Sequence, residues 1–482
     1  MIVVLLLSQL NCLAQFNRYF PHDRDSITTS LFEASLINKA EEILVIKQAV
    51  EYHNSDSLSQ IWQFYFEQFD FGGNRLNKVS INKKFNLDSN WLFFVYPSIV
   101  KDPLGGYRFI VSKWNLNDSS EFQIKLCWIS EGLDSIRIND LENISFLDSI
   151  CPSLKVGNLK IDLKGGYFLH FDFPEERCFS NYPGTNMIVH LDEQGELDWY
   201  RTFDDNFPLS ETIMDITRHP TTGKIYFCGN EAYTGYSCPN NGPYYCEQFG
   251  FLYKCDSMGY NCQRIYHEQD TVDSHQECNF VSVLPSGKIA LSHPINYGRG
   301  VFTTLSGGTP RMILFDENAN LLEELIVQDD SAVKAKFTAL YEVDNNEYYF
   351  IRHGNAVLDG NLNQLGGQIY MPTQEVSVFH GEQVVQTQPI YLPNHKGINS
   401  EYWINSSAMD SSGRILLSGK MYSDSLNTVL PYMVLSDEQG CFPLLPCTPL
   451  GVEEIEAKER LKVYPNPASD QFTLELEEAE NV

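Results

Sequence analysis

The stretch "VHLDEQGEL" spans residues 189–197 and decides the fold. It alternates apolar and polar residues, turns at Asp192 and Gly195, and then alternates again. Alternation with a period of two is the pattern of a half-buried β-strand. An Asp that opens a tight turn caps it with its side chain, and the Gly supplies the positive φ angle that the turn needs. The stretch therefore predicts a β-hairpin.

The same pattern recurs along the chain at intervals of about sixty residues, or twice that. It returns in "EQFDFGGNR" (67–75), "LYKCDSMGYN" (252–261), "ILFDENANL" (313–321) and "VLSDEQGCF" (434–442). Two weaker copies, "CWISEGLDS" (127–135) and "SVFHGEQVV" (377–385), fill the two longer gaps. The chain thus carries seven copies of one hairpin.

A second turn pattern interleaves with the first, as in "LKGGYFLHF" (163–171), "PSGKIALSH" (285–293) and "SSGRILLSG" (411–419). Its seven copies are anchored at residues 42, 106, 166, 223, 287, 347 and 413. Two hairpins per repeat make four antiparallel strands, and such a repeat is the signature of a radial β-propeller. An ordinary β-sandwich with turn chemistry that matches by chance is the alternative.

We therefore predict an all-β fold, a seven-bladed β-propeller of four-stranded antiparallel blades over residues 33–447. The predicted blades span residues 33–83, 92–139, 143–203, 211–270, 274–328, 335–390 and 399–447. All the tight turns should lie on one face, and the longer loops on the other. Residues 16–32 form an N-terminal extension that can add a ring-closing strand, because a ring must close to hide its edges.

The N-terminus reads "MIVVLLLSQLNCLAQ" and resembles a signal peptide over residues 1–15. Its apolar core is too short to span a bilayer. No Lys or Arg precedes this core, so either the true start lies upstream or the signal is atypical. Cys12 raises the alternative of a lipoprotein, but the residues before it fit that pattern poorly. We expect cleavage near Ala14 or Gln15, and the later segments contain no membrane-spanning run.

Eleven cysteines follow the predicted signal peptide. Export makes disulfides plausible, and three closely spaced pairs are candidates: Cys238 with Cys246, Cys255 with Cys262, and Cys441 with Cys447. A metal site is the weaker interpretation, because zinc sites usually contain a C-x-x-C pair and this chain has none. Because the number of cysteines is odd, at least one of them is left as a free thiol, unless the signal boundary lies elsewhere.

Two segments resemble known families. Lys164-Gly165-Gly166-Tyr167 and the Asp192 turn followed by Trp199 resemble the propeller repeats of exported Bacteroidetes proteins, which implies a fold and no particular activity. Residues 448–460 form an acidic linker, and 461–482 begin with Tyr464-Pro465-Asn466-Pro467. This motif resembles the start of the C-terminal sorting domain of type IX secretion substrates. The resemblance implies the type IX machinery as a partner and a secreted or outer-membrane surface location. Only the first part of that domain is present, which an incomplete reading frame would explain.

The composition is acidic, with 63 Asp and Glu against 34 Lys and Arg and a net charge of −29. Such a balance disfavours a nucleic-acid partner, because phosphate binding needs a basic face. The chain contains no H-E-x-x-H, G-x-S-x-G or phosphate-binding loop motif, and no loop has calcium-ligand spacing. We therefore assign no catalytic residue, no metal and no cofactor, and we expect a monomer.

Two functions remain open. The first is a binding module for an extracellular glycan, peptide or protein, and the second is a polymer-degrading hydrolase or lyase at the channel mouth. An enzyme should show two close carboxylates with separated pKa values. For the binding module, the long loops of blades four and five are the predicted surface, because variable loops on a rigid scaffold carry recognition. The candidate residues are Tyr233, Tyr236, Tyr244, Tyr245, Tyr297 and Arg299.

Overall fold

The structure is a computed structural model and describes the strands and tight turns. The described residues are 16–20, 27–38, 42–52, 60–85, 91–115, 122–140, 155–157, 159–173, 185–203, 209–233, 247–267, 278, 280–293, 295–296, 308–309, 311–326, 334–344, 347–357, 370–380, 383–389, 401–423, 428–437, 461–465 and 472–476. Within these residues, one short helix, α2 (Ile81–Lys84), interrupts an otherwise all-β chain. The predicted all-β class is therefore confirmed.

The strands form four-stranded antiparallel units, which we number in chain order. Unit 1 contains β2 (Ile27–Asn38), β3 (Glu42–Tyr52), β4 (Gln60–Asp70) and β5 (Arg75–Ser80). Unit 2 contains β6 (Trp91–Lys101), β7 (Tyr107–Asn115), β8 (Phe122–Ile129) and β9 (Ile136–Asp140). Unit 3 begins with two short pieces, β10 (Lys155–Val156) and β11 (Lys160–Ile161), and continues with β12 (Tyr167–Phe173), β13 (Thr185–Leu191) and β14 (Leu197–Phe203).

Unit 4 contains β15 (Leu209–Arg218), β16 (Ile225–Tyr233), β17 (Glu247–Cys255) and β18 (Gln263–His267). Unit 5 contains β19 (Phe280–Val283), β20 (Ile289–Ser292), β23 (Arg311–Phe315) and β24 (Leu321–Ile326), with the small ribbon β21 (Ile295–Asn296) and β22 (Gly308–Thr309) between them. Unit 6 contains β25 (Lys334–Asp344), β26 (Glu347–Val357), β27 (Tyr370–His380) and β28 (Gln383–Pro389).

Unit 7 is built from both ends of the chain. Its first three strands are β29 (Glu401–Met409), β30 (Ile415–Ser423) and β31 (Thr428–Leu435), and its fourth strand is β1 (Phe16–Tyr19). β1 pairs antiparallel with β31, from Phe16 opposite Leu435 to Tyr19 opposite Tyr432. β2 pairs parallel with the same strand at Thr29 and Val429, which joins units 7 and 1 into one eight-stranded sheet. The segment that follows the Asp437 turn in sequence lies outside the described residues. The fourth strand described here therefore comes from the N-terminal extension.

The predicted turn chemistry is present in the hairpins. The Asp192 carboxylate accepts hydrogen bonds from the backbone N–H groups of Gln194 (2.9 Å) and Glu196 (2.8 Å), and Gly195 has a φ angle of 88°. Asp256 and Asp316 cap their turns in the same way. In the weaker copy the Ser130 hydroxyl replaces the carboxylate and accepts from the N–H groups of Asp134 and Ser135.

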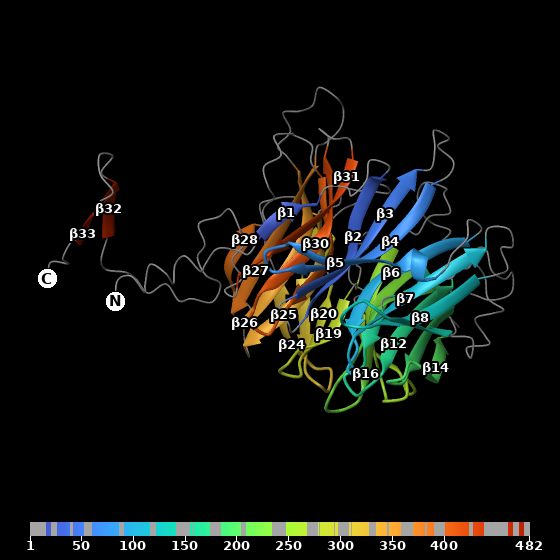
Figure 1. Cartoon of the computed structure of the whole chain (residues 1–482). Coiled ribbons are helices and arrows are strands. Elements are labelled where there is room, and N and C mark those ends of the chain that lie inside the picture. Colours follow the sequence, from blue (N-terminus) through green and yellow to red (C-terminus); the bar gives the residue numbers. More distant parts are fainter. Residues whose placement is uncertain are drawn as a thin grey trace, which may run out of the picture.

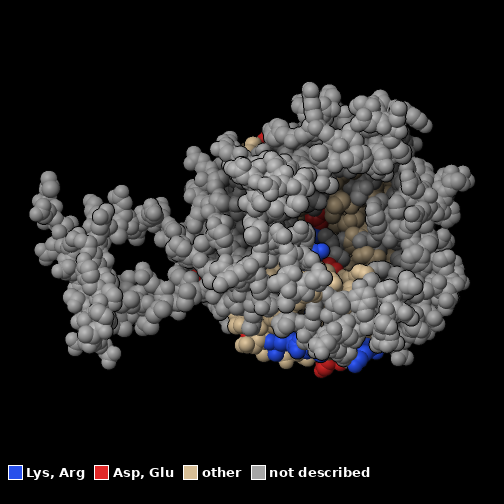
Figure 2. All heavy atoms as spheres, turned by 90° about the horizontal axis from the view of Figure 1, so that it is seen from above, with Lys and Arg blue, Asp and Glu red and all other residues tan. Residues whose placement is uncertain are grey.

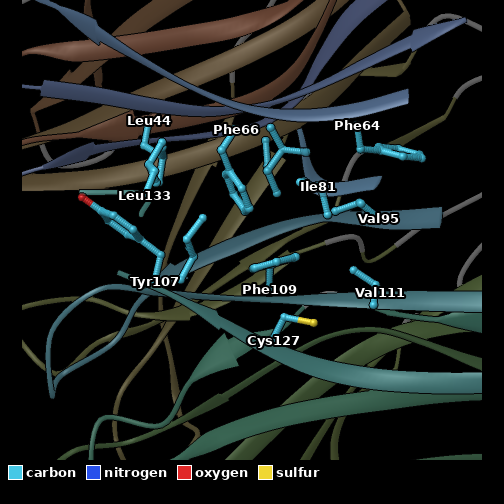
Figure 3. Close-up of a cluster of buried hydrophobic side chains, with 13 residues drawn as sticks. Leu44, Phe64, Phe66, Ile81, Val95, Tyr107, Phe109, Val111, Cys127 and Leu133 are labelled. Atoms are coloured by element: carbon cyan, nitrogen blue, oxygen red, sulfur yellow. The ribbon is translucent and has the colours of Figure 1, made fainter. Parts of the chain in front are cut away.

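Each unit packs on the next through a cluster of buried apolar side chains. Between units 1 and 2, for example, Phe66 from β4 meets Phe109 from β7, with ring centroids 4.7 Å apart (Figure 3). Similar clusters join units 2 and 3, 3 and 4, 4 and 5, 5 and 6, and 6 and 7. A further cluster joins unit 7 to unit 1, where Leu416 and Met433 pack with Phe32 and Phe69. The series of contacts therefore returns to its start.

The first strands of the units also contact one another in sequence order. β2 lies against β6, β6 against β11, β15 against β19, β19 against β25, β25 against β29, and β29 against β2. Polar side chains join unit 7 to unit 1 at this level, since Ser418 donates to the Ser35 hydroxyl (2.8 Å) and Asn405 donates to the Phe32 carbonyl (2.9 Å). Between units 3 and 4 the corresponding contact is that of β15 with β12.

The C-terminal segment forms a separate two-stranded ribbon. β32 (Leu461–Pro465) and β33 (Phe472–Leu476) pair only with each other and stand apart from the units (Figure 1). The two strands of this segment therefore satisfy each other's backbone groups rather than adding to a unit. Asn466 and Pro467 of the sorting motif lie outside the described residues.

Candidate binding site

The predicted binding residues fall almost entirely outside the described part of the chain. Tyr233 ends β16, where its backbone lies between Leu209 and Glu247. Tyr236, Tyr244, Tyr245, Tyr297 and Arg299 belong to segments that are not described, as do Cys238, Cys246, Cys441 and Cys447. What the structure does place are the strands that carry the two loops.

The stems of the two loops are neighbours. β16 and β17 flank residues 234–246 and are paired over their whole length, from Ile225 opposite Cys255 to Tyr233 opposite Glu247. β20 and β23 flank the second loop in unit 5. The two stems pack together through Tyr226, Cys228 and Leu252 of unit 4 and the apolar residues of unit 5. Both loops therefore leave adjacent units at the end opposite to their tight turns.

One of the three predicted disulfides lies within the described residues. Cys255 and Cys262 are bonded, with Cα atoms 4.0 Å apart, and they flank the Asp256 turn between β17 and β18. This bond fixes the turn end of unit 4. Cys127, Cys228 and Cys278 are present as buried thiols.

The polar groups at the turn end are used within the protein. Arg108 of unit 2 donates to the Asp102 carboxylate (2.7 Å) and to the carbonyls of Glu193 (3.0 Å) and Gln194 (3.2 Å) in the turn of unit 3. Tyr226 donates in the same manner to the Glu317 carbonyl in the turn of unit 5 (3.0 Å). The turns of neighbouring units thus hold one another. In Figure 1 the described turns of units 3 to 5 lie at the lower end of the molecule.

A buried network that sequence reasoning missed joins units 3 and 4. His190 lies between two carboxylates, with Nε2 2.8 Å from Asp162 and Nδ1 2.9 Å from Asp198, and Arg218 pairs with Asp162 at 2.8 Å. The His190 ring stacks on Trp199, with centroids 5.3 Å apart. A histidine between carboxylates can take part in catalysis, but no nucleophile is among these contacts and both ring nitrogens are engaged. The network therefore stabilises the junction of the two units.

A second buried network lies on the first strands of units 3, 4 and 5. The Asp215 carboxylate pairs with the Lys160 ammonium (3.1 Å) and accepts the backbone N–H groups of Ile216 (2.9 Å) and Val281 (3.1 Å). Burial raises the pKa of Asp215, while Lys160 opposes this shift. One carboxylate thereby connects three consecutive units.

The carboxyl groups with raised pKa values do not form a pair within the described residues. Burial raises the pKa of Glu33 on β2 as it does for Asp215 on β15, and the nearby charge in each case is a lysine, Lys420 or Lys160. Each of these two carboxyl groups is therefore balanced by a lysine, while Asp162 and Asp198 share the His190 ring. Among the described residues, no group of three or more His, Cys, Asp or Glu side chains is placed to hold a metal ion.

Figure 2 looks onto the end opposite to the turns and shows a hollow at its centre. Charged side chains of both signs and other described residues are visible inside it. Among the described residues, no helix is long and apolar enough to cross a membrane. The hollow and the loops that leave the units at this end are the candidate binding site.

No protein-family model matches the chain, and no curated protein matches it. Solved structures match at low similarity. The chain is 10% identical to the polysaccharide lyase Uly1, with a TM-score of 0.49 over 87% of this chain and 92% of that one. It is 11% identical to an α-L-arabinofuranosidase from Fusarium graminearum, with a TM-score of 0.40 over 78% and 100%. It is 12% identical to puromycin hydrolase, with a TM-score of 0.41 over 84% of this chain, and spans only 51% of that protein. These similarities carry no argument about function.

Proposed function

We propose that the chain is a seven-bladed β-propeller in which units 1 to 7 are the blades. The support is the order of contacts, since each unit packs on the next and unit 7 packs on unit 1. β1 completes the last blade and covers the edge of β31. Closure of this kind removes exposed sheet edges, which would otherwise recruit other strands.

The protein acts as a binding module for an extracellular ligand, a glycan in the first instance. One observation carries this proposal: Arg108 and Tyr226 at the turn end donate to the turns of neighbouring units, whereas the opposite end holds the hollow and the strand ends that lead into the predicted tyrosine segments. Tyrosine offers rigid contact area with a polar tip, which suits sugar rings. The net charge of −29 disfavours polyanionic glycans, so neutral ones are the best candidates.

Export is part of the same proposal. Residues 1–15 serve as the signal peptide, and the Tyr464-Pro465-Asn466-Pro467 motif marks a sorting domain read by the type IX secretion machinery. The mature protein is a secreted or surface-attached monomer. N-terminal sequencing of the exported protein should find its first residue at position 15 or 16. Retention of residues 1–14 in exported protein would contradict the signal assignment.

A glycan array followed by titration calorimetry tests the ligand proposal. Combined replacement of Tyr236, Tyr244, Tyr245 and Tyr297 by Ala should abolish binding and leave the melting transition nearly unchanged. Tyr200 and Tyr260 provide the matched control, because both are exposed tyrosines, 43% and 55% accessible, outside the loop end.

Two outcomes would overturn the assignment. The first is a ligand whose binding is lost on replacing Tyr200 and Tyr260 but kept in the loop variant. The second is a turnover product from an array glycan, which would favour the hydrolase or lyase. If the protein binds peptides but no glycans, the proposed ligand class is wrong and the proposed binding site still stands.

A further inference from the structure

Cys228 and Cys278 are two thiols that meet across the junction of units 4 and 5. The Cys228 Sγ donates to the Cys278 carbonyl at 3.7 Å, and both residues are fully buried in the same apolar cluster. Cys278 is held in place from its other side, because its backbone N–H donates to the Asn230 side chain at 2.7 Å. Cys228 and Asn230 lie two residues apart on β16, so they share one face of that strand.

The sulfur of Cys278 lies in space that a glycine leaves open. It lies over Gly250 on β17, where an added Cβ would come within 2.4 Å of it. Gly250 pairs with Asn230, and Leu252 pairs with Cys228. The Cys278 sulfur is therefore a diagonal neighbour of Cys228 across the two strands, a position from which a change of its rotamer can direct it toward Cys228.

We propose that Cys228 and Cys278 become a disulfide when the protein folds in an oxidising compartment. The bond connects β16 to the segment that enters unit 5, and it lies against β16 and β17, the two strands that flank residues 234–246. It thereby fixes the base of the loop that the proposed function assigns to ligand recognition, and only this consequence rests on that function. The bond itself depends on the geometry alone.

The chemistry needs a disulfide oxidant such as oxidised glutathione. One cysteine thiolate attacks the glutathione disulfide, forms a mixed disulfide and releases one reduced glutathione. The second cysteine thiolate then displaces the other glutathione. The two protein thiols are oxidised, one glutathione disulfide is reduced to two thiols, and the two thiol protons end on these products.

Burial decides when the exchange takes place. It raises the pKa of the Cys228 thiol well above its ordinary value, so the thiolate is scarce once the fold is complete. Since the thiolate is the attacking species, the bond must form during folding. A protein that folds in its reduced state should then resist later oxidation at this pair.

Peptide mapping under non-reducing conditions tests the proposal on the full chain. The protein is refolded from the reduced, denatured state in a glutathione redox buffer, alkylated and digested. A cross-linked peptide containing Cys228 and Cys278 is expected in most molecules. The Cys255–Cys262 bond serves as the positive control, and Cys127, a buried thiol of unit 2, should be recovered alkylated.

Variants separate the bond from general packing. In a background where all the other candidate disulfide cysteines (238, 246, 255, 262, 441 and 447) are replaced by Ser, a reductant should lower the melting temperature by ~5 °C, because the bond closes a loop of about fifty residues. Replacing both Cys228 and Cys278 by Ser should remove this response to reductant. Hydrogen exchange in β16 and β17 should also be faster in that double variant.

Recovery of Cys228 and Cys278 as alkylated thiols after oxidative refolding would overturn the proposal. A reductant response that survives in the double variant would also overturn it. Neither result depends on a ligand, so failure here leaves the proposed function standing. Conversely, an intact bond with no ligand on the arrays counts against the binding function alone.

Discussion

Arg108 provides the sharpest test of the idea that the turns of neighbouring units hold one another. Its guanidinium is 5% exposed and makes one ion pair and two further hydrogen bonds to two different units. The same group lies 4.8 Å from the centre of the Tyr167 ring. Arg108→Ala removes all of these contacts and leaves Asp102 buried without its counter-charge.

The expected cost follows from these contacts. Breaking a buried ion pair by removing one partner destabilises a protein by about 3–5 kcal/mol. Asp102 keeps one hydrogen bond, from the Leu104 N–H at 2.8 Å, which favours the lower end of that range. We therefore expect the free energy of unfolding to fall by about 3 kcal/mol.

Arg137 is the matched control, because it also lies over an aromatic ring, at 4.8 Å from the centre of Trp128, but is exposed. Arg137→Ala should cost less than about 1 kcal/mol. Urea unfolding followed by circular dichroism at pH 7 measures both variants. Equal midpoints for the two would refute the claim that the turn end is consolidated by Arg108. The double variant Arg108→Ala with Asp102→Ala should recover part of the loss, since no buried charge is then left alone.

Three further results are expected. Phe20→Ala should lower the free energy of unfolding by about 2 kcal/mol, because this half-buried ring packs with its centroid 4.9 Å from that of Phe69, where units 7 and 1 meet. Leu104→Ala is the control and should change almost nothing, because Leu104 is exposed. Equal melting temperatures for the two variants would count against the contact between units 7 and 1. Gly166→Ala should cost ~2 kcal/mol or more, because its φ is 92° and a Cβ would lie 2.1 Å from the Leu191 carbonyl oxygen. Gly132→Ala is the control in thermal melts, because its Cβ would meet only the Asp134 carboxyl carbon, at an ordinary contact distance of 4.0 Å. Burial lowers the pKa of His170 to about 4, so the unfolded chain takes up a proton before the folded chain does as the pH falls below about 6.5. The free energy of unfolding should therefore decrease between pH 6.5 and 4. A His170→Asn variant whose free energy of unfolding has the same pH dependence over that range would refute this contribution.

The sequence allowed the local structure to be predicted because the determinants of the hairpins are local. An Asp and a Gly three residues apart are enough to specify the turn, and the Asp192 and Asp256 turns have the expected caps. In "CWISEGLDS" a Ser does the same work, and Leu133 adopts the positive φ angle of 57° where Gly stands elsewhere. This substitution explains why the copy is hard to recognise by its letters.

The networks between units were not predictable in this way. His190 lies on β13, Arg218 on β15 and Asp162 in the turn after β11, and their meeting depends on how units 3 and 4 pack together. The pairing of Cys228 with Cys278 is hidden for the same reason, because close spacing in sequence was the only available criterion for a disulfide. The candidate ligand residues lie in loops whose placement no repeat pattern determines, apart from the position of their stems.

The strand that completes unit 7 is the first described strand of the chain. β1 pairs with β31, so residues separated by more than four hundred positions must meet before the last sheet is complete. Closing a loop of that size is slow, and topologies dominated by such distant pairings have low folding rates. The same feature slows the reverse process: strain or heat must detach β1 and part the Phe20 contacts before the units can separate. We therefore expect a long-lived native state whose lifetime, rather than its equilibrium stability, sets how long the protein stays folded.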